Sequence, residues 1–205
     1  MICASLIQLD QQATLWLNSL HSPFSDQIWM LFSNVRIWFP LYAVIVFFLF
    51  RNLGWKRALV VLVSLILTVV LTDQIANLVK SSVMRLMPCH TPELLEQGLW
   101  CPLPKGGKYG FFSAHAANTF AFAMASTLGF ASKKGGVSVY YIIGIFVWAA
   151  LVSLSRVFMA MHYLGDILAG MLFGLAVGTL MGLLARWIIG RLKIETGTAK
   201  ELTEQ

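Results

Sequence analysis

The sequence predicts an all-α fold, a polytopic transmembrane helix bundle of about five to six spans with an interfacial helix at its N-terminal end. Two observations carry this prediction. Of the 205 residues, 58% are apolar and only 12% are charged, which is too little charge to cover a soluble core with polar surface. The apolar residues also fall in nearly charge-free stretches close to the ~20 residues that a membrane helix needs. We therefore expect residues 1–205 to form a single integral-membrane domain.

Each predicted element follows from one stretch of the chain. Residues 6–20 alternate apolar and polar side chains at helical spacing, which is typical of a helix on a membrane surface, so 1–23 is expected to be an interfacial segment. The sequence leaves open whether 24–50 is one helix kinked at Pro40 or an interfacial helix followed by a short span. The expected spans are 37–50, 58–79, 113–132, 135–155 and 157–185. An outer loop is expected at 81–112 and a flexible cytoplasmic tail at 194–205.

The basic residues indicate the orientation of the bundle and argue against a nucleic-acid partner, which the net charge of +6 alone would suggest. Cytoplasmic loops of membrane proteins are enriched in Lys and Arg. Three basic groups fall on one side of the predicted spans: Arg51, Lys56 and Arg57; Lys133 and Lys134; Arg186, Arg191 and Lys193. We expect that side to be cytoplasmic, and no nucleic acid is expected as a partner. Five others gather on the outer side: Lys80, Arg85, Lys105, Lys108 and Arg156.

Two cysteines share the predicted outer loop. In an oxidising compartment Cys89 and Cys101 can close a short disulfide loop, worth about 2–3 kcal/mol of loop entropy. Two free thiols are the alternative.

Several ionisable side chains lie in or at the outer ends of the predicted spans. Such residues cost free energy at membrane depth unless they are paired, so they indicate a functional site. They are Asp73, Lys80, His115, Arg156, His162 and Asp166. Two imidazoles, carboxylates and fixed cations together predict an anion-binding site with acid–base chemistry. Asp73 is expected to be a partner of Lys or Arg rather than a catalytic group.

His162 and Asp166 stand four residues apart, so on a helix they share one face. A carboxylate at that position can accept a hydrogen bond from Nδ1–H, which leaves Nε2 free to attack or to take a proton. The same pair suits a divalent metal ion, or forms a buried structural pair. Because nearby Lys and Arg side chains would repel a cation, no metal and no cofactor is expected.

Small residues recur every four positions in two of the spans. The last span carries Gly170, Gly174, Gly178 and Gly182, and the span that begins at Ser113 carries Ala117, Ala121, Ala125 and Gly129. Small residues at this spacing let membrane helices approach closely. We therefore expect the two helices to pack together, which sets Ser113 and His115 beside His162 and Asp166.

Ser113 also has the chemistry of a helix N-cap, since it opens the run SAHAANTFAF. First-turn amides at such a helix start favour an anion. Three glycines just upstream, Gly106, Gly107 and Gly110, let the backbone approach a phosphate. Together with the ionisable cluster, this helix start narrows the predicted anion to a phosphate-like group.

Three short motifs follow one another along the chain: Lys80 with Pro88, then Ser113-Ala114-His115, then Ser155–Arg156 with His162 and Asp166. They resemble the three signatures of the type 2 phosphatidic acid phosphatase superfamily of lipid phosphate phosphatases, in its bacterial integral-membrane branch. Those signatures are K-x6-R-P, P-S-G-H and S-R-x5-H-x3-D, and the third is matched in full. The motifs occur in the superfamily's order, at the outer ends of three successive spans, so the resemblance covers about 56–190.

The resemblance implies a mechanism and assigns its residues. His162 attacks phosphorus to form a phosphohistidine, with Asp166 orienting the imidazole. His115 protonates the leaving oxygen and then activates water. No metal is required. The implied phosphate-binding groups are Lys80, Arg156, Ser113 and Ala114, and we expect Arg85, which lies outside the signature, to substitute for a missing arginine.

The missing arginine is the main departure, because the position before Pro88 holds Met87. Losing a charged donor to a transferring phosphoryl group costs several kcal/mol of transition-state stabilisation. This departure favours one alternative, a catalytically weakened lipid-phosphate binder or transporter that retains the fold. A proton- or metal-coupled carrier is the other alternative, but the polar residues gather at one membrane face and leave the centres of the spans apolar.

The expected substrate is an amphiphile, because the site lies at the boundary between membrane and water. Undecaprenyl diphosphate is the first expectation and a lipid A phosphate the second, and phosphatidylglycerol phosphate and phosphatidic acid also fit. The expected location is the bacterial inner (cytoplasmic) membrane, with the active site facing the periplasm or the outside.

Overall fold

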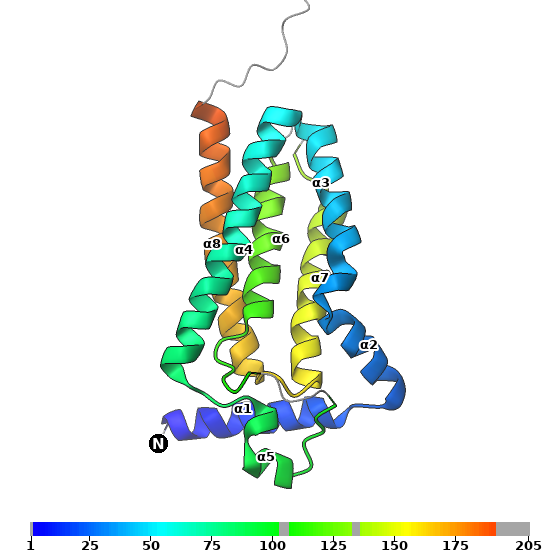
Figure 1. Ribbon diagram of the computed structural model, residues 1–205, viewed down its shortest axis with the longest axis vertical. Coiled ribbons are helices and arrows are strands. Elements are labelled where there is room, and N and C mark those ends of the chain that lie inside the picture. The colour runs from blue at the N-terminus through cyan, green and yellow to red at the C-terminus, as the bar shows by residue number, and fades with distance from the viewer. Residues whose placement is uncertain (1, 103–106, 133–135, 192–205) are drawn as a thin grey trace, which may run out of the picture.

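The computed structural model describes residues 2–102, 107–132 and 136–191, and these are helical almost throughout (Figure 1). The α-helices are α1 (Ile2–Ser19), α2 (Pro23–Ser33), α3 (Phe39–Leu53), α4 (Trp55–Val83), α5 (Pro92–Glu96), α6 (Ala114–Phe130), α7 (Val139–Phe158) and α8 (Leu164–Arg191). Two short 3₁₀ helices, η1 (Val35–Trp38) and η2 (Pro88–His90), precede α3 and α5.

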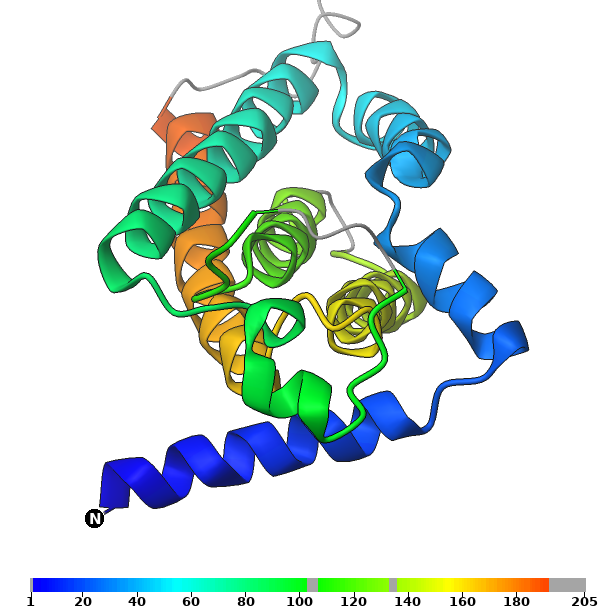
Figure 2. The same cartoon turned by 60° about the horizontal axis from the view of Figure 1, so that its bottom comes forward.

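Four stretches of the described chain are long and apolar enough to cross a membrane: Val35–Leu53, Trp55–Val83, Val139–Phe158 and Leu164–Arg191. The remaining predicted span, 113–132, corresponds to α6, a helix of 17 residues. It lies in the centre of the bundle, and most of its residues are buried (Figure 2). The predicted all-α membrane bundle is confirmed. The chain is an integral membrane protein.

The segment 24–50 is not one kinked helix but holds α2, η1 and α3 in succession, which answers a question that the sequence left open. The break lies at Asn34, whose side-chain oxygen accepts a 3.1 Å hydrogen bond from the Arg36 N–H and so begins η1. Pro40 does not kink a helix. It lies in the first turn of α3, where a backbone N–H would have no partner within the helix, so the N–H that proline lacks is not needed.

The boundary between the last two spans differs from the prediction. Helix α7 continues to Phe158 and α8 begins only at Leu164, so His162 lies on the intervening turn rather than on a helix face. Ala160 has a φ of +55°, a left-handed backbone that cannot continue an α-helix.

Helices α6 and α8 pack together as the two stripes of small residues predict. A Cβ atom added at Gly174 would lie 2.3 Å from the carbonyl oxygen of Ala117, and one at Gly178 would lie 2.4 Å from that of Ala121. Gly129 departs from the pattern, since it faces Val61 of α4. The backbones of α6 and α8 therefore touch where α8 carries glycine and α6 carries alanine, and this close packing fixes the two helix starts beside each other.

The two ends of the bundle differ in charge. One end holds the end of α3, the start of α4 and the end of α8, and with them Arg51, Lys56, Arg57, Arg186 and Arg191. The other end holds α1, which lies across the bundle, and α5 (Figures 1 and 2). We call it the α1 end, and the start of α6 and the turn between α7 and α8 also lie there. Lys105, Lys133, Lys134, Lys193 and the predicted tail 194–205 lie outside the described residues.

Candidate active site

A cavity of about 980 Å³ runs into the bundle between α4, η1, α3, α6 and α7. Its polar part lies at the α1 end, where five of the predicted site residues line it: Lys80, Ala114, His115, Arg156 and His162. These residues come from the end of α4, the start of α6, the end of α7 and the turn before α8. The structure thus brings together in one cavity residues that are up to 82 positions apart in the chain.

His162 is held by a tight turn. The backbone N–H groups of Met161 and His162 both donate to the carbonyl of Arg156, at 2.9 and 3.2 Å. The His162 side chain is 2% exposed, and burial lowers its pKa below the usual histidine value, although the Asp166 carboxylate opposes this shift. A lowered pKa keeps the imidazole neutral near pH 7, which is the form that a nucleophilic histidine requires.

Asp166 is fully buried next to His162 and does not line the cavity. Its Oδ2 atom accepts a 3.0 Å hydrogen bond from the Tyr163 N–H and lies 3.6 Å from His162 Nδ1, slightly beyond hydrogen-bond distance. The predicted His162–Asp166 pair therefore exists, although it forms across a turn into a helix. With Nδ1 facing Asp166, the other ring nitrogen of His162 is the one available to the cavity.

Ser113 caps the start of α6, and Ala114 lines the cavity there. The Ser113 side chain caps α6 by accepting from the Ala116 N–H at 3.4 Å, and its own N–H donates to the Asp166 carbonyl at 3.1 Å. Ser113 is fully buried and does not line the cavity, whereas Ala114 does. The cavity therefore meets the first turn of α6, whose amides have no partner within the helix.

Ser33, at the end of α2, is a site residue that sequence reasoning missed. Arg156 Nη1 donates to the Ser33 hydroxyl oxygen, and the backbone of Ser33 hydrogen-bonds His115. One residue of α2 thus contacts both a predicted phosphate-binding cation and the predicted acid–base histidine. A serine near the end of a short helix carries no local signal of this role.

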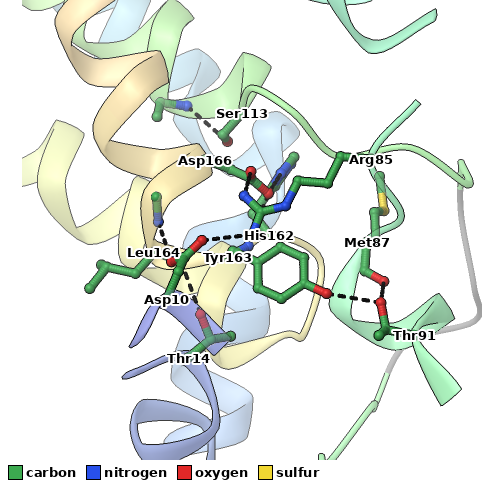
Figure 3. Close-up of polar contacts among 12 residues, drawn as sticks. Asp10, Thr14, Arg85, Met87, Thr91, Ser113, His162, Tyr163, Leu164 and Asp166 are labelled. Atoms are coloured by element: carbon green, nitrogen blue, oxygen red, sulfur yellow. Dashed lines mark hydrogen bonds and ion pairs between the residues drawn. The ribbon is translucent and has the colours of Figure 1, made fainter. Parts of the chain in front are cut away.

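Arg85 takes a different position from the one that the sequence predicts. Its guanidinium does not line the cavity with His162, but donates to Asp166 Oδ1 and to Asp10 Oδ2, each at 2.7 Å (Figure 3). Burial acts to lower the pKa of Arg85, and the two carboxylates outweigh it and raise that pKa. Arg85 therefore contacts the Asp166 carboxylate and not the cavity that His162 lines.

Asp10 is the second residue that sequence reasoning missed. It lies on α1, which the sequence presents only as an amphipathic surface helix. A signal was available, because Asp10, Thr14 and Asn18 recur every four residues and form one polar stripe. Thr14 and Asn18 are both buried, so this stripe faces the bundle rather than water.

Asp73 lies on the cavity wall within α4, two turns before Lys80. Its carboxylate accepts from the side-chain amides of Asn77 at 3.1 Å and Asn118 at 3.4 Å. Asp73 also interacts electrostatically with Lys80, the kind of partner that the sequence predicts. Asp73, Asn77 and Asn118 form a band of polar groups deeper in the cavity than the two histidines.

Met87 lines the cavity where the superfamily's arginine is expected, and it is 6% exposed. Met87 and Cys89 belong to one buried apolar cluster at the α1 end, and Cys101 packs against it. The disulfide between them stays a prediction. Among the residues that the structure describes, no three His, Cys, Asp or Glu side chains gather as a metal site.

Comparison with known proteins agrees with this geometry. The chain is 34% identical over 193 residues to a lipid A 4'-phosphatase of Bacteroides thetaiotaomicron, covering 93% of this chain and 83% of the relative. It is 29% identical over 174 residues to a lipid A 4'-phosphatase of Porphyromonas gingivalis, covering 84% and 71%.

The fold also has a solved counterpart. The crystal structure of a transmembrane PAP2 type phosphatidylglycerolphosphate phosphatase from Bacillus subtilis superimposes with a TM-score of 0.66 at 19% identity, covering 94% of this chain and 89% of that one. The sequence profile of the PAP2 superfamily, the type 2 phosphatidic acid phosphatases, matches residues 57–189. With its three motifs gathered around one cavity, the chain belongs to the PAP2 superfamily.

Proposed function

We propose that this integral membrane phosphatase of the PAP2 superfamily releases inorganic phosphate from a phosphorylated lipid A, through a phosphohistidine on His162. The observation that carries the proposal is the cavity, which joins a cationic, histidine-bearing end to long apolar walls. A phosphate group fits the first part and hydrocarbon chains fit the second. A water-soluble phosphate ester needs no such walls.

The length of the cavity supports a lipid substrate. Its lining on α4 extends from Leu62 to Lys80, a rise of about 27 Å at ~1.5 Å per residue, which is close to the thickness of a bilayer's hydrocarbon core. Phe39, Ile66 and Val70 line the cavity and are also 61%, 55% and 51% exposed. These apolar side chains connect the cavity with the lipid-facing surface of the bundle.

The proposed chemistry assigns one step to each histidine. The free ring nitrogen of His162 attacks phosphorus, the bond from phosphorus to the lipid oxygen breaks, and His115 donates the proton that this oxygen takes up. Water then attacks the phosphohistidine while His115 takes the water's proton, and the nitrogen–phosphorus bond breaks to release inorganic phosphate. Lys80, Arg156 and the first-turn amides of α6 stabilise the charge of the transferring group.

Two observations favour lipid A over undecaprenyl diphosphate, the first expectation from the sequence. Both curated relatives described above bear the name lipid A 4'-phosphatase. The polar band of Asp73, Asn77 and Asn118 lies between the phosphate end and the apolar walls. A sugar headgroup offers hydroxyl and amide groups at that depth, whereas a polyprenyl chain joined directly to its phosphates does not.

The proposed location is the bacterial inner membrane with the α1 end outside. The distribution of basic residues supports it, since the described Lys and Arg at the opposite end follow the enrichment of cytoplasmic loops. The histidines at the α1 end then face the periplasm.

A substrate panel tests the proposal. The full chain, purified in detergent, is given lipid A with its 4'-phosphate, undecaprenyl diphosphate, phosphatidylglycerol phosphate or phosphatidic acid at equal mole fraction, with and without EDTA. We expect phosphate release from lipid A to exceed the others by about tenfold or more in kcat/KM, and EDTA to have no effect. Faster release from undecaprenyl diphosphate would overturn the proposed substrate. Binding of all four lipids without release would instead support the catalytically weakened binder.

A further inference from the structure

We infer that helix α1 is part of the active site, and that its Asp10 is a positioning residue that holds Arg85 against the catalytic Asp166. The inference rests on the proposed function, since it concerns the carboxylate behind the nucleophile. It assigns α1 a task in the reaction in addition to contact with the membrane.

The carboxylates of Asp10 and Asp166 share a single guanidinium. Arg85 Nη2 donates to Asp10 Oδ2 and Nη1 donates to Asp166 Oδ1, both at 2.7 Å (Figure 3). The side chains of Asp10 and Arg85 are 16% and 25% exposed, whereas that of Asp166 is 0% exposed. The polar chain therefore runs from α1 at the surface into the buried group that contacts His162.

Aromatic contact fixes the plane of the guanidinium. The Arg85 guanidinium carbon lies 3.9 Å from the centre of the Tyr163 ring, a cation–π arrangement. The Tyr163 N–H also donates to Asp166 at 3.0 Å. The guanidinium is planar and can donate to two partners at once only in one orientation. Stacking on Tyr163 holds Arg85 in the orientation that lets it bond both carboxylates.

Helix α1 is attached to the start of α8 by its polar stripe. Asp10 Oδ1 accepts from the Gly165 N–H at 2.7 Å, and Thr14 Oγ1 accepts from the Leu164 N–H at 3.1 Å. First-turn amides have no partner within their own helix, so α1 supplies the cap that α8 lacks in its own sequence. The same helix thus fixes both the start of α8 and, through Arg85, the orientation of Asp166 two residues into α8.

Gly165 makes this approach possible. A Cβ atom at that position would lie 2.8 Å from Asp10 Oδ2 and 3.1 Å from Asp10 Cγ. Any larger residue would therefore push the short Asp10 side chain away from Arg85.

The charges around His162 decide what removal of each partner does. Asp166 faces the imidazole from α8, Lys80 from α4, Arg156 from α7 and His115 from α6. Behind Asp166 lie Arg85, Tyr163 and Asp10. Removing the Asp10 charge leaves Arg85 with more uncompensated positive charge beside Asp166, whereas removing the Arg85 charge leaves an uncompensated negative one.

The experiment measures kcat/KM against pH for Asp10→Asn and Arg85→Gln with one substrate, so that titration of the substrate is common to all profiles. His162 attacks when neutral, so activity is lost as pH falls through its pKa. We expect Asp10→Asn to move this acid limb to lower pH and Arg85→Gln to move it to higher pH, each by about half a unit. We expect kcat to fall by about 10- to 100-fold for Arg85→Gln, as is usual when a group that orients a catalytic residue is lost, and less for Asp10→Asn.

Matched variants separate positioning from simple destabilisation. Gly165→Ala, which displaces Asp10 without altering its charge, should lower kcat, and Asp10→Glu should restore part of the activity lost in Asp10→Asn. Gln12→Ala, an exposed position on the same helix, should behave as the parent chain. Acid limbs that stay in place or move in the same direction overturn the inference. Activity that survives His162→Ala overturns the proposed function instead, so the two failures are distinguishable.

Discussion

Replacement of His162 by alanine is expected to abolish phosphate release, with kcat lower by about four orders of magnitude or more. The proposed nucleophile is the ring nitrogen of His162 that does not face Asp166, and His162 lines the cavity together with Lys80, Arg156 and the start of α6. Without that nitrogen the reaction loses its covalent step, and the cations alone stabilise the charge. The measurement is inorganic phosphate released from the preferred lipid of the panel.

Trapping the intermediate sharpens this test. Rapid acid-free quenching of the parent chain with substrate labelled in its phosphate should leave label on His162, and His162→Ala should carry none. His21→Ala is the matched control, because His21 stacks on Trp100 with ring centres 4.5 Å apart and does not line the cavity. Label bound at another residue, or turnover in His162→Ala, would contradict the assigned nucleophile.

Gly174→Ala is expected to lower the free energy of unfolding by about 2–3 kcal/mol, although alanine is the better helix former. The added Cβ atom meets the Ala117 carbonyl oxygen at 2.3 Å, and that oxygen belongs to a helix backbone that cannot move aside alone. Helices α6 and α8 must separate along their length. Because the start of α6 carries His115 and α8 follows His162, phosphate release should fall as well.

Gly190→Ala on the same helix provides the control, since an added Cβ atom there meets nothing within 4 Å. Thermal unfolding in one detergent, followed by circular dichroism, compares the two variants. Equal midpoints for Gly174→Ala and Gly190→Ala would mean that close packing of α6 on α8 does not limit stability. Gly178→Ala, with its 2.4 Å contact, should resemble Gly174→Ala.

The sequence could predict those parts of the site that local spacing encodes. Lys80, His115 and Arg156 lie near the ends of α4, α6 and α7 at the α1 end, and His162 lies on the turn after α7. Antiparallel spans bring such ends together. The stripes of small residues likewise encode the pairing of α6 with α8, because four-residue spacing places them on one face.

The position of Arg85 could not be predicted, because it depends on pairing between distant loop segments. The Met87 N–H donates to the Lys108 carbonyl at 3.1 Å, and the Gly110 N–H donates to the Arg85 carbonyl at 2.9 Å. These bonds turn the Arg85 side chain toward Asp166 rather than toward the cavity. The spacing of Arg85 from Pro88 does not reveal these backbone hydrogen bonds. The sequence alone therefore predicts that Arg85 contacts the phosphate.

Asp10 was missed for a related reason. It lies 155 positions from Gly165, the backbone group that it caps. The alternation of polar and apolar residues on α1 predicts an amphipathic helix. It does not show whether the polar face of that helix contacts water or the rest of the protein. The burial of Thr14 and Asn18, which decides between these cases, exists only in the folded chain.

The apolar walls of the cavity have a consequence for kinetics. Phe39, Ile66 and Val70 belong both to the cavity and to the outer surface of the bundle, so a lipid can reach His162 by lateral diffusion without leaving its leaflet. Encounter is then a two-dimensional process, governed by the mole fraction of substrate in the surface and not by its amount per volume of solution. Inert detergent added at a constant bulk concentration of substrate should therefore slow turnover, because it lowers the mole fraction of substrate in the surface. By the same lateral route, the dephosphorylated lipid is expected to return to the leaflet from which the substrate came.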